Sequence, residues 1–148
     1  MYKVKSFNID HTKIIAPSVT LIDTLTADNL TINKYAIRLC KPNEWYIRPE
    51  TMHTLEHFFA LEIRNILKDV FDLSPMGCMT GFYLTVLCDY KITDIETAIT
   101  ECMSKVITAN DIPAANILEC GNYKFMDLAD AKIICKSFLN KNSINIFL

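Results

Sequence analysis

Two of the three histidines in this chain lie close together, in the segment His53-Thr-Leu-Glu-His57. On a helix, a separation of four residues leaves two side chains only about 40° apart around the axis, so both imidazoles can reach one metal ion. Glu56 lies about 60° to the other side of His53, near such an ion but poorly placed to share its ligand direction. The spacing therefore indicates a metal site on a helix, although two histidines can also share a helix face by chance.

A third protein ligand is needed, and Cys120 is the best candidate because a thiolate is a strong, soft ligand. Two histidines and one cysteine would leave a fourth position open, which is typical of a catalytic metal site. A second thiol, Cys78, lies in Ser74-Pro-Met-Gly-Cys78-Met-Thr-Gly81, a turn of the kind that exposes a reactive side chain. A nearby cation would lower its pKa and make it a base or a nucleophile. A metal with Glu56 and Cys78 suits enolisation next to a carbonyl better than simple hydrolysis.

The other four cysteines are expected to be structural, as small buried hydrophobes, and these are Cys40, Cys88, Cys102 and Cys135. No apolar signal sequence is visible at the N-terminus, so we expect reduced thiols rather than disulfides. All three glycines accompany the two chemically interesting cysteines: Gly77 and Gly81 lie close to Cys78, and Gly121 follows Cys120. Glycine permits backbone geometries that other residues resist, so these positions are expected to shape two loops unless they are ordinary turns.

Strands are expected in the first half of the chain and again near its middle. The β-rich stretches 18–23 and 31–40 and the apolar run 81–89 follow strand patterns, whereas 72–77 is expected to be a loop. Because side chains alternate along a strand, Lys34 and Arg38 share one face, which on its own is most simply a side turned to solvent.

Three helices are expected to accompany these strands. The first follows Pro49 and covers about 50–68, the second covers about 93–109 after a Thr93/Glu96 capping box, and the third is capped by Asp127 and ends near 140. Cys120 falls between the last two, on a short strand or loop. Strands mixed with helices, without a regular βαβ alternation, predict an α+β fold: a mainly antiparallel sheet with helices packed against it.

Composition and charge limit the classes of function. The 148 residues are 51% hydrophobic and 22% charged, which predicts one folded domain over residues 1–148. The formal net charge of -2 argues against a nucleic-acid partner, since phosphate neutralisation needs a basic face. No apolar run reaches the ~18–20 residues of a membrane span, so no membrane contact is expected, and the predicted location is the cytoplasm.

Several stretches, in the same order along the chain, strongly resemble the S-ribosylhomocysteine lyases of the LuxS family, and they span residues from about 5 to 140. They are Phe7-Asn-Ile-Asp-His11-Thr, Ile37-Arg38-Leu-Cys40-Lys-Pro-Asn43, His53-Thr-Leu-Glu-His57, Leu73-Ser-Pro-Met-Gly-Cys78-Met-Thr-Gly-Phe-Tyr83 and Ile112-Pro-Ala-Ala-Asn116 through Cys120-Gly121. The Ser-Pro-Met-Gly-Cys loop together with the His-Thr-Leu-Glu-His helix is highly specific.

The resemblance implies a lyase that cleaves S-ribosylhomocysteine to homocysteine and 4,5-dihydroxy-2,3-pentanedione, the precursor of the quorum-sensing signal autoinducer-2. The implied reaction moves a carbonyl along the sugar and then eliminates homocysteine, with Cys78 and Glu56 as the acid–base pair. The resemblance also implies one divalent metal per chain, Fe2+ natively with Zn2+ or Co2+ as substitutes, held by His53, His57 and Cys120.

By the same resemblance, Ser6, His11, Lys34 and Arg38 match positions that line a substrate pocket at the interface of a homodimer with shared active sites. The shared face of Lys34 and Arg38 then becomes a polar pocket wall instead of a side turned to solvent.

Two other functions remain open from the residues alone. One is a small zinc peptidase, since the order H-x-x-E-H is also that of the inverted zinc peptidases, with Glu56 as the base on a metal-bound water. The chain is short for that class, and this hypothesis gives Cys78 no role. The other is a non-enzymatic metal-binding domain, which would prefer four protein ligands where only three good ones are found.

Overall fold

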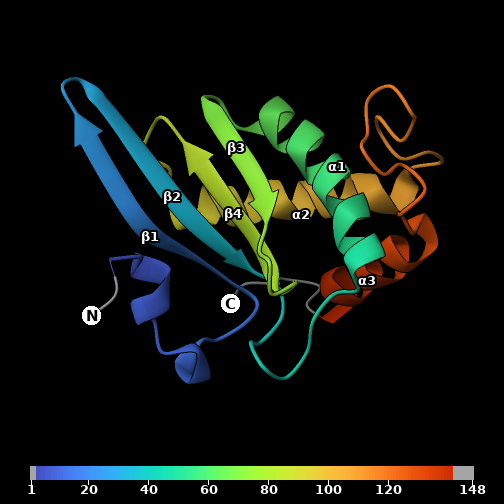
Figure 1. The fold of residues 1–148 in the computed structure, drawn as a ribbon, viewed down its shortest axis with the longest axis horizontal. Helices are drawn as coiled ribbons and strands as arrows, with labels where there is room; N and C mark the ends of the chain where they lie inside the picture. The colour runs from blue at the N-terminus through green and yellow to red at the C-terminus, as the bar shows by residue number, and fades with distance from the viewer. Residues whose placement is uncertain (1–2, 142–148) are drawn as a thin grey trace.

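The computed structural model describes residues 3–141, and its elements run in one continuous order (Figure 1). Two short 3₁₀ helices come first, η1 (Lys5–Asn8) and η2 (His11–Lys13), followed by strands β1 (Ser18–Ala27) and β2 (Leu30–Arg38). The remaining elements are α1 (Pro49–Ile66), β3 (Val70–Pro75), β4 (Gly81–Val86), α2 (Ile92–Thr108) and α3 (Leu128–Lys141).

The four strands form one antiparallel sheet in the order β1-β2-β4-β3. Ile37 of β2 pairs with Phe82 of β4, and both side chains are fully buried in the core. Lys34 and Arg38 alternate with the core-facing residues of β2 and so lie on the opposite face of the sheet. The expected pairing of these two basic residues on one face is therefore present.

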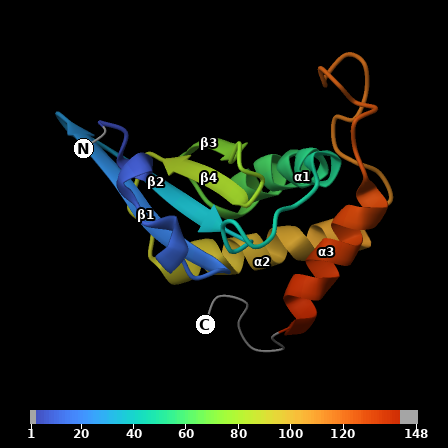
Figure 2. The same cartoon turned by 60° about the horizontal axis from the view of Figure 1, so that its bottom comes forward.

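Helices α1 and α2 cover one face of this sheet, and α3 packs against them. In Figure 1 α2 runs behind the strands, and Figure 2 shows the sheet as one layer above α2, with α3 packed across α2. Phe59 of α1 packs against Phe82 of β4, with 5.2 Å between the ring centroids. One hydrophobic cluster includes side chains from the sheet and from all three helices. The expected α+β class is confirmed: a four-stranded antiparallel sheet with helices packed against it.

The first and last helices begin as the sequence predicts. Pro49 occupies the first turn of α1, where its missing N–H is not needed. The carboxylate of Asp127 accepts a hydrogen bond from the backbone N–H of Asp130 at 2.9 Å, so Asp127 caps the start of α3.

Two local expectations were wrong. The segment 72–77 is not all loop, because residues up to Pro75 belong to β3, which pairs with β4 and buries Leu73. Proline is tolerated there because β3 is an edge strand and Pro75 is its last residue. The Thr93/Glu96 capping box does not form: α2 is preceded by Lys91, and no side chain caps it.

The cysteines are all free thiols, as expected. Cys40, Cys102 and Cys135 are buried, and this burial raises the pKa of each to about 12. Cys88 is only half-buried, just beyond the end of β4. None of the helices within residues 3–141 combines the length and apolar character needed to cross a bilayer.

Candidate metal and substrate site

His53 and His57 project from one face of α1, with their ring centroids 5.0 Å apart. The Nδ1 atom of His53 lies 2.8 Å from the carbonyl oxygen of Phe125, and that of His57 lies 2.7 Å from the carbonyl oxygen of Pro113. A carbonyl oxygen can only accept, so both Nδ1 atoms must carry the proton in these bonds. Each ring therefore keeps the lone pair of Nε2 free for a metal, and the bond at Nδ1 fixes its orientation.

Cys120 joins the two histidines from the loop between α2 and α3. Its Sγ lies 3.5 Å from Nε2 of His53, and one donor atom from each of the three side chains falls within 4.8 Å of the others. The turn that presents Cys120 is held by Asn116. The Oδ1 of Asn116 accepts the backbone N–H of Leu118 and of Glu119, and its carbonyl oxygen accepts the N–H of Cys120 at 3.0 Å.

Contacts between α1 and the start of α3 fix this loop relative to the histidines. The Oγ1 of Thr54 accepts the backbone N–H of Asp127 at 2.8 Å, and Thr51 donates to the carboxylate of Asp130. Both threonines are fully buried. The ligand-bearing face of α1 is thus tied directly to the segment that follows Cys120, which keeps the three donors together.

The chemistry of the three donors fits a divalent transition metal. Two imidazoles and one thiolate suit Zn2+ or Fe2+, and carbonyl groups that orient metal-ligating histidines are the usual outer partners of such sites. Glu56 lies beside them, with its Oε2 3.8 Å from Nε2 of His57. The structure therefore brings together the three expected ligands and leaves the expected carboxylate next to them.

The second thiol, Cys78, is exposed on the tight turn between β3 and β4. Hydrogen bonds from Met76 N–H to the Gly81 carbonyl and from Met79 N–H to the Met76 carbonyl close this turn, at 2.8 and 2.9 Å. Met79 takes the left-handed conformation, with φ of 58°.

The glycines shape these loops less than expected. Gly77 and Gly121 have no positive φ, and a Cβ at either position would meet nothing within 4 Å. Gly81 is different, because a Cβ there would lie 2.0 Å from the carbonyl oxygen of Ile37. The close approach of β2 and β4 next to the Cys78 turn therefore requires glycine at position 81 only.

Arg38 and Thr80 surround the sulfur of Cys78. The Oγ1 of Thr80 lies 3.0 Å from Sγ, and Nη1 of Arg38 lies 3.6 Å from it and also donates to Oγ1 of Thr80. Partial removal of the Cys78 sulfur from water is the largest single influence on this thiol and alone would raise its pKa. Hydrogen bonds from the side chain and backbone of Thr80, together with the positive charge of Arg38, outweigh it and lower the pKa below the ordinary thiol value.

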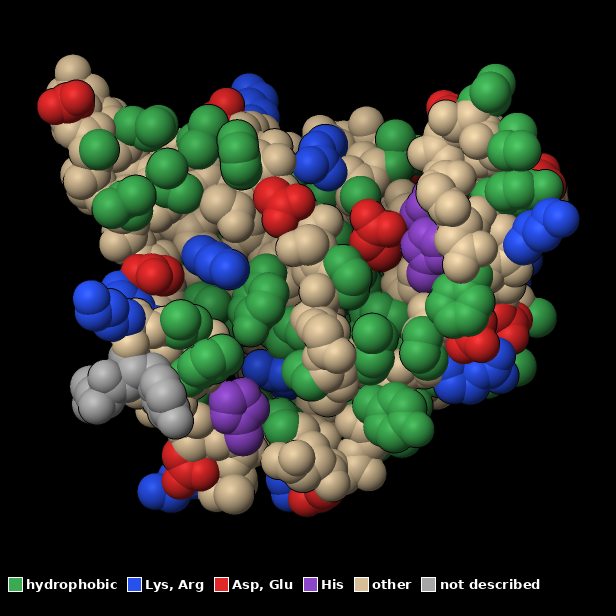
Figure 3. Space-filling model, in the orientation of Figure 1, with side chains coloured by type: hydrophobic (Ala, Val, Ile, Leu, Met, Phe, Trp, Pro, Cys, Tyr) green, Lys and Arg blue, Asp and Glu red, His purple; other side chains and the backbone are tan. Residues whose placement is uncertain are grey.

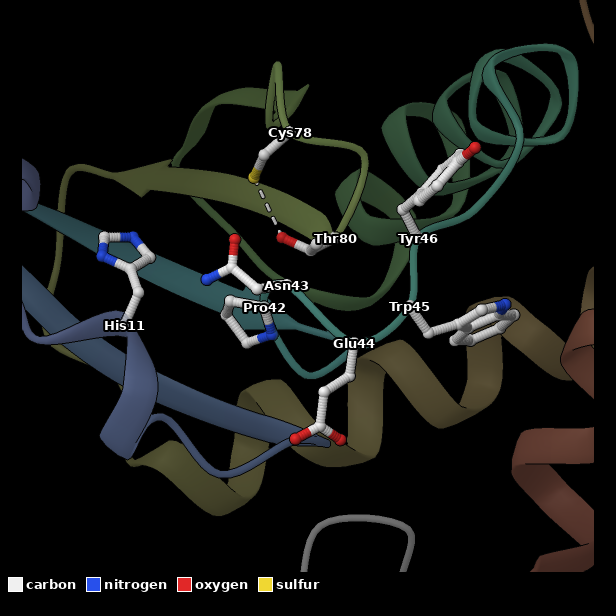
Figure 4. A pocket seen from close by; sticks show the side chains of 8 residues that line it. All are labelled: His11, Pro42, Asn43, Glu44, Trp45, Tyr46, Cys78 and Thr80. Carbon is white, nitrogen blue, oxygen red and sulfur yellow. Dashed lines mark hydrogen bonds between the residues drawn. The ribbon is translucent and has the colours of Figure 1, made fainter.

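A pocket of about 400 Å³ opens beside Cys78. Figure 4 shows Cys78 and Thr80 side by side on one wall of this pocket, with their side chains pointing toward each other. His11, from the N-terminal segment, lies on another part of the wall. Its lining residues come from η2, from the segment after β2 and from the Cys78 turn, and they are His11, Pro42, Asn43, Glu44, Trp45, Tyr46, Cys78 and Thr80.

The four expected substrate-binding residues do not all meet at this pocket. His11 lines it, and the buried side chain of Arg38 reaches the sulfur of Cys78 from β2. Ser6 is half-buried in η1 and is not among the lining residues. Lys34 is exposed on the outer face of the sheet, with its Nζ 4.4 Å from the centroid of the Tyr83 ring.

The metal donors and the Cys78 pocket are separate within one chain. None of the three donors lines the pocket. Figure 3 shows histidine at two separate places on the same face of the molecule, the face on the side of the sheet away from α2. The two groups thus open in the same direction but do not form one cavity within the described residues.

Thr80, whose hydroxyl contacts the sulfur of Cys78, was not among the residues expected in this site. Its only signal was its position two residues after Cys78, and the left-handed Met79 between them breaks the strand pattern that would have placed both on one face. The aromatic side chains of Trp45 and Tyr46 were also overlooked, because nothing in the stretch after β2 separates a pocket wall from an ordinary connection.

Comparisons with known proteins identify the family of this chain. The family model described as S-ribosylhomocysteinase (LuxS) matches residues 4–146. Curated S-ribosylhomocysteine lyases from Clostridium botulinum and Clostridioides difficile are 42% and 40% identical to the chain, in each case over 99% of both proteins. The S-ribosylhomocysteine lyase of Clostridium perfringens is 44% identical over 94% of this chain and 93% of the relative. The chain belongs to the LuxS family of S-ribosylhomocysteinases.

Proposed function

We propose that this chain is a metal-dependent S-ribosylhomocysteine lyase that releases homocysteine and 4,5-dihydroxy-2,3-pentanedione. The observation that carries the proposal is the separation of two thiols into two settings: Cys120 gathers with two histidines, whereas Cys78 lies at a pocket with its pKa lowered. One thiol is then available as a ligand and the other as a proton carrier. The activity named for the relatives agrees with both roles.

The metal in this proposal is one divalent ion per chain, Fe2+ natively, with Zn2+ or Co2+ as substitutes. His53, His57 and Cys120 would hold it, and their half-buried side chains leave room for a further ligand. When bound, such an ion supplies a Lewis acid that polarises the carbonyl oxygen of the open-chain sugar.

Cys78 is the base and acid of the two carbonyl shifts. Its thiolate takes the proton from C2 of the open-chain sugar and the thiol returns it to C1, while the hydroxyl proton at O2 passes to O1, so that the aldehyde becomes a 2-ketone. The same exchange between C3 and C2 moves the carbonyl to C3. A thiol whose pKa is lowered toward neutrality is suited to both halves of each transfer.

Glu56 acts in the final elimination. With the carbonyl at C3, the C4 proton is acidic; its removal forms the C4–C5 double bond while the C5–S bond breaks and homocysteine leaves as a thiolate. The resulting enol then tautomerises to the diketone. The carboxylate of Glu56 is placed beside the metal ligands, 3.8 Å from His57, where it can take up this proton.

His11 and Arg38 bind the substrate in this proposal, together with Ser6 and Lys34. His11 is on the pocket wall already, and the positive charge of Arg38 also lies against the Cys78 sulfur. Ser6 and Lys34 lie outside the pocket lining of one chain. They would contact substrate only where a second chain extends the pocket.

We propose that the active unit is a homodimer with two shared sites. The metal donors and the Cys78 pocket open on one face of the chain without meeting. A two-fold axis through that face would bring the pocket of one chain against the donors of its partner, and by symmetry the reverse pair as well. Phe71 and Leu25, exposed at 70% and 62% in the strands of this sheet, are apolar surface that such contact would bury.

The proposed setting is a single cytoplasmic domain over residues 1–148 whose diketone product is the precursor of autoinducer-2. No part of the proposed chemistry needs nucleic acid or a membrane. The net charge of -2 and the absence of a membrane-spanning helix in residues 3–141 are compatible with this setting.

The test is direct conversion of S-ribosylhomocysteine by the purified, metal-loaded protein. After the protein and its own thiols have been removed by ultrafiltration, homocysteine and the diketone are quantified by mass spectrometry. The proposal expects the two products in equal amounts. It fails if the metal-loaded wild-type protein forms neither.

A further inference from the structure

The hydroxyl of Thr80 is a buried polar group at the edge of the Cys78 pocket. Only 4% of Thr80 and 6% of Arg38 is exposed, so both side chains need partners inside the protein. Thr80 Oγ1 contacts Arg38 Nη1 on one side and Cys78 Sγ on the other.

The chemistry of Arg38 fixes the direction of these hydrogen bonds. A guanidinium has donors and no acceptor, so Arg38 must donate to Oγ1 of Thr80. The proton of the Thr80 hydroxyl is then free to point toward the sulfur of Cys78, 3.0 Å away. The other acceptor nearby, Sδ of Met76 at 4.0 Å, is a weak thioether at the limit of contact. The three groups thus form a chain from guanidinium to hydroxyl to sulfur.

The backbone of Thr80 has a separate structural role that does not involve its side chain. The carbonyl oxygen of Thr80 accepts the backbone N–H groups of Leu39 and Cys40, at 2.9 and 3.0 Å, and these bonds hold the end of β2 beside the turn. A substitution that removes only the hydroxyl leaves both of them in place. The two roles of Thr80 can therefore be separated by experiment.

We propose that Thr80 is a positioning residue for Cys78: its hydroxyl accepts a hydrogen bond from Arg38, donates one to the sulfur and so orients the thiolate toward the pocket and stabilises it, in addition to the direct contact of Arg38 with the sulfur. The inference rests on the proposed function in one respect, that Cys78 is the thiol that carries the substrate proton. The ionisation of Cys78 itself can be measured without substrate.

The test is the pH dependence of Cys78 alkylation by iodoacetamide in the metal-loaded protein, for the wild type, Thr80→Val and Thr80→Ser. Only the thiolate reacts, so the midpoint of the rate profile gives the pKa of the thiol. A hydrogen bond to a charged group is strong enough that its loss in Thr80→Val should raise the midpoint by about one pH unit or more. Thr80→Ser keeps the hydroxyl and should stay near the wild-type midpoint.

Cys88 is the internal control for this experiment. It lies on the same tryptic peptide as Cys78, and its sulfur contacts the Lys68 carbonyl instead of Thr80. Tandem mass spectrometry separates the two sites, and the Cys88 profile should not move in any variant. If Thr80→Val does not fold, Thr80→Ala removes the same hydroxyl with less bulk and should give the same upward shift.

Turnover then separates this inference from the proposed function. If Thr80 positions the reactive thiolate, the kcat of Thr80→Val should fall at neutral pH and recover as the pH rises past the new midpoint, while metal content is unchanged. A folded Thr80→Val or Thr80→Ala protein with the wild-type alkylation midpoint would overturn the inference. A wild-type protein that does not cleave substrate but shows the Thr80-dependent midpoint would contradict the proposed function and leave the Thr80–Cys78 hydrogen bond supported.

Discussion

The surroundings of each thiol decide what it can do. Cys102 and Cys135 are fully buried in the core, and this burial raises the pKa of each to about 12. Both thiols therefore stay protonated at neutral pH. Cys78 differs because Thr80 and Arg38 provide a hydrogen bond and a positive charge that outweigh the effect of burial. The immediate contacts of these thiols thus separate inert ones in the core from a reactive one at the pocket.

The residue-scale role of Cys78 predicts a selective loss in Cys78→Ala. The variant should keep its metal, because Cys78 is not among the three donors, but should no longer exchange the C2 hydrogen of the substrate with deuterated solvent. One positioned acid–base group typically contributes about 10²–10⁴-fold, so homocysteine release should fall by that order. NMR of the substrate measures the exchange. Cys88→Ala is the matched control and should behave as the wild type; near-normal homocysteine release by Cys78→Ala would reduce Cys78 to a structural residue.

Glu56 should be needed at a later step. We expect Glu56→Gln to keep its metal and bind substrate, since the amide has nearly the shape of the carboxylate, yet to stall at or before elimination because it cannot accept the C4 proton. A ketone intermediate should accumulate and be visible by mass spectrometry as an isomer of the substrate. Glu62→Gln, on the same helix but outside the donor group, is the control. Product formation by Glu56→Gln at the wild-type rate would exclude Glu56 as the base.

The donor set predicts that His53 and His57 hold the metal and that His11 does not. His57→Ala should lose most of its metal and all homocysteine release, because it removes one of three ligands and the partner of the Pro113 carbonyl. His11→Ala removes a histidine from the pocket and should keep its metal. Elemental analysis of both purified variants gives the metal content per chain. Full occupancy in His57→Ala, or equal loss in His11→Ala, would contradict the assignment.

At the scale of the elements, the approach of β2 to β4 places Arg38 against the Cys78 turn. Gly81 is the partner of Arg38 in the register of these strands, and its missing side chain allows the backbones to come close. Similarly, the bonds from α1 to the residues around Asp127 hold His53 near the loop of Cys120. Both halves of the site thus depend on contacts between elements that are distant in sequence.

Gly81→Ala should therefore destabilise the protein where Gly77→Ala does not. A Cβ at position 81 would lie 2.0 Å from the Ile37 carbonyl oxygen and must displace backbone, which typically costs about 1–3 kcal/mol. We expect the melting temperature to fall by several degrees, measured by circular dichroism on the metal-loaded proteins. A Cβ at position 77 meets nothing within 4 Å, so Gly77→Ala should melt as the wild type does. Equal melting temperatures of the two variants would contradict the close approach.

The helices could be predicted from the sequence because their apolar residues repeat at helical spacing. Expected limits of about 50–68 and 93–109 compare with Pro49–Ile66 and Ile92–Thr108 in the structure. Strand β3 could not be predicted, because Asp, Ser and Pro in a short segment resemble a loop and only the pairing with β4 makes it a strand. The helical spacing also predicted that His53 and His57 lie on the same face of one helix.

The contact of Arg38 with Cys78 and Thr80 could not be derived from local patterns. Strand alternation placed Arg38 on a face but gave no partner, since the pairing of β2 with β4 joins residues 43 to 53 positions apart. The resemblance to a family supplied Arg38 as a substrate residue. Its second contact, with the Thr80 hydroxyl, became visible only in three dimensions.

At the scale of the whole molecule, one face of the sheet is covered by helices, and both halves of the proposed site open on the side of the molecule away from α2. Figure 3 shows hydrophobic side chains over the strands of this face, with histidine on either side of its centre. In the proposed homodimer, a second copy facing this side would bring the Cys78 thiol of one chain to the metal-donor group of the other. The central claim is therefore a lyase whose active site combines two chains.

The measurement that tests this claim most directly is homocysteine release by a mixed dimer. Cys78→Ala and Glu56→Gln chains, each inactive alone, are co-expressed with different tags and purified through both tags. If each site takes Cys78 from one chain and Glu56 from its partner, one of the two sites in the mixed dimer carries no substitution, and activity should return to about half of the wild-type value. If the mixed dimer stays as inactive as its parents while the wild type is active, the site lies within a single chain, and the account is contradicted.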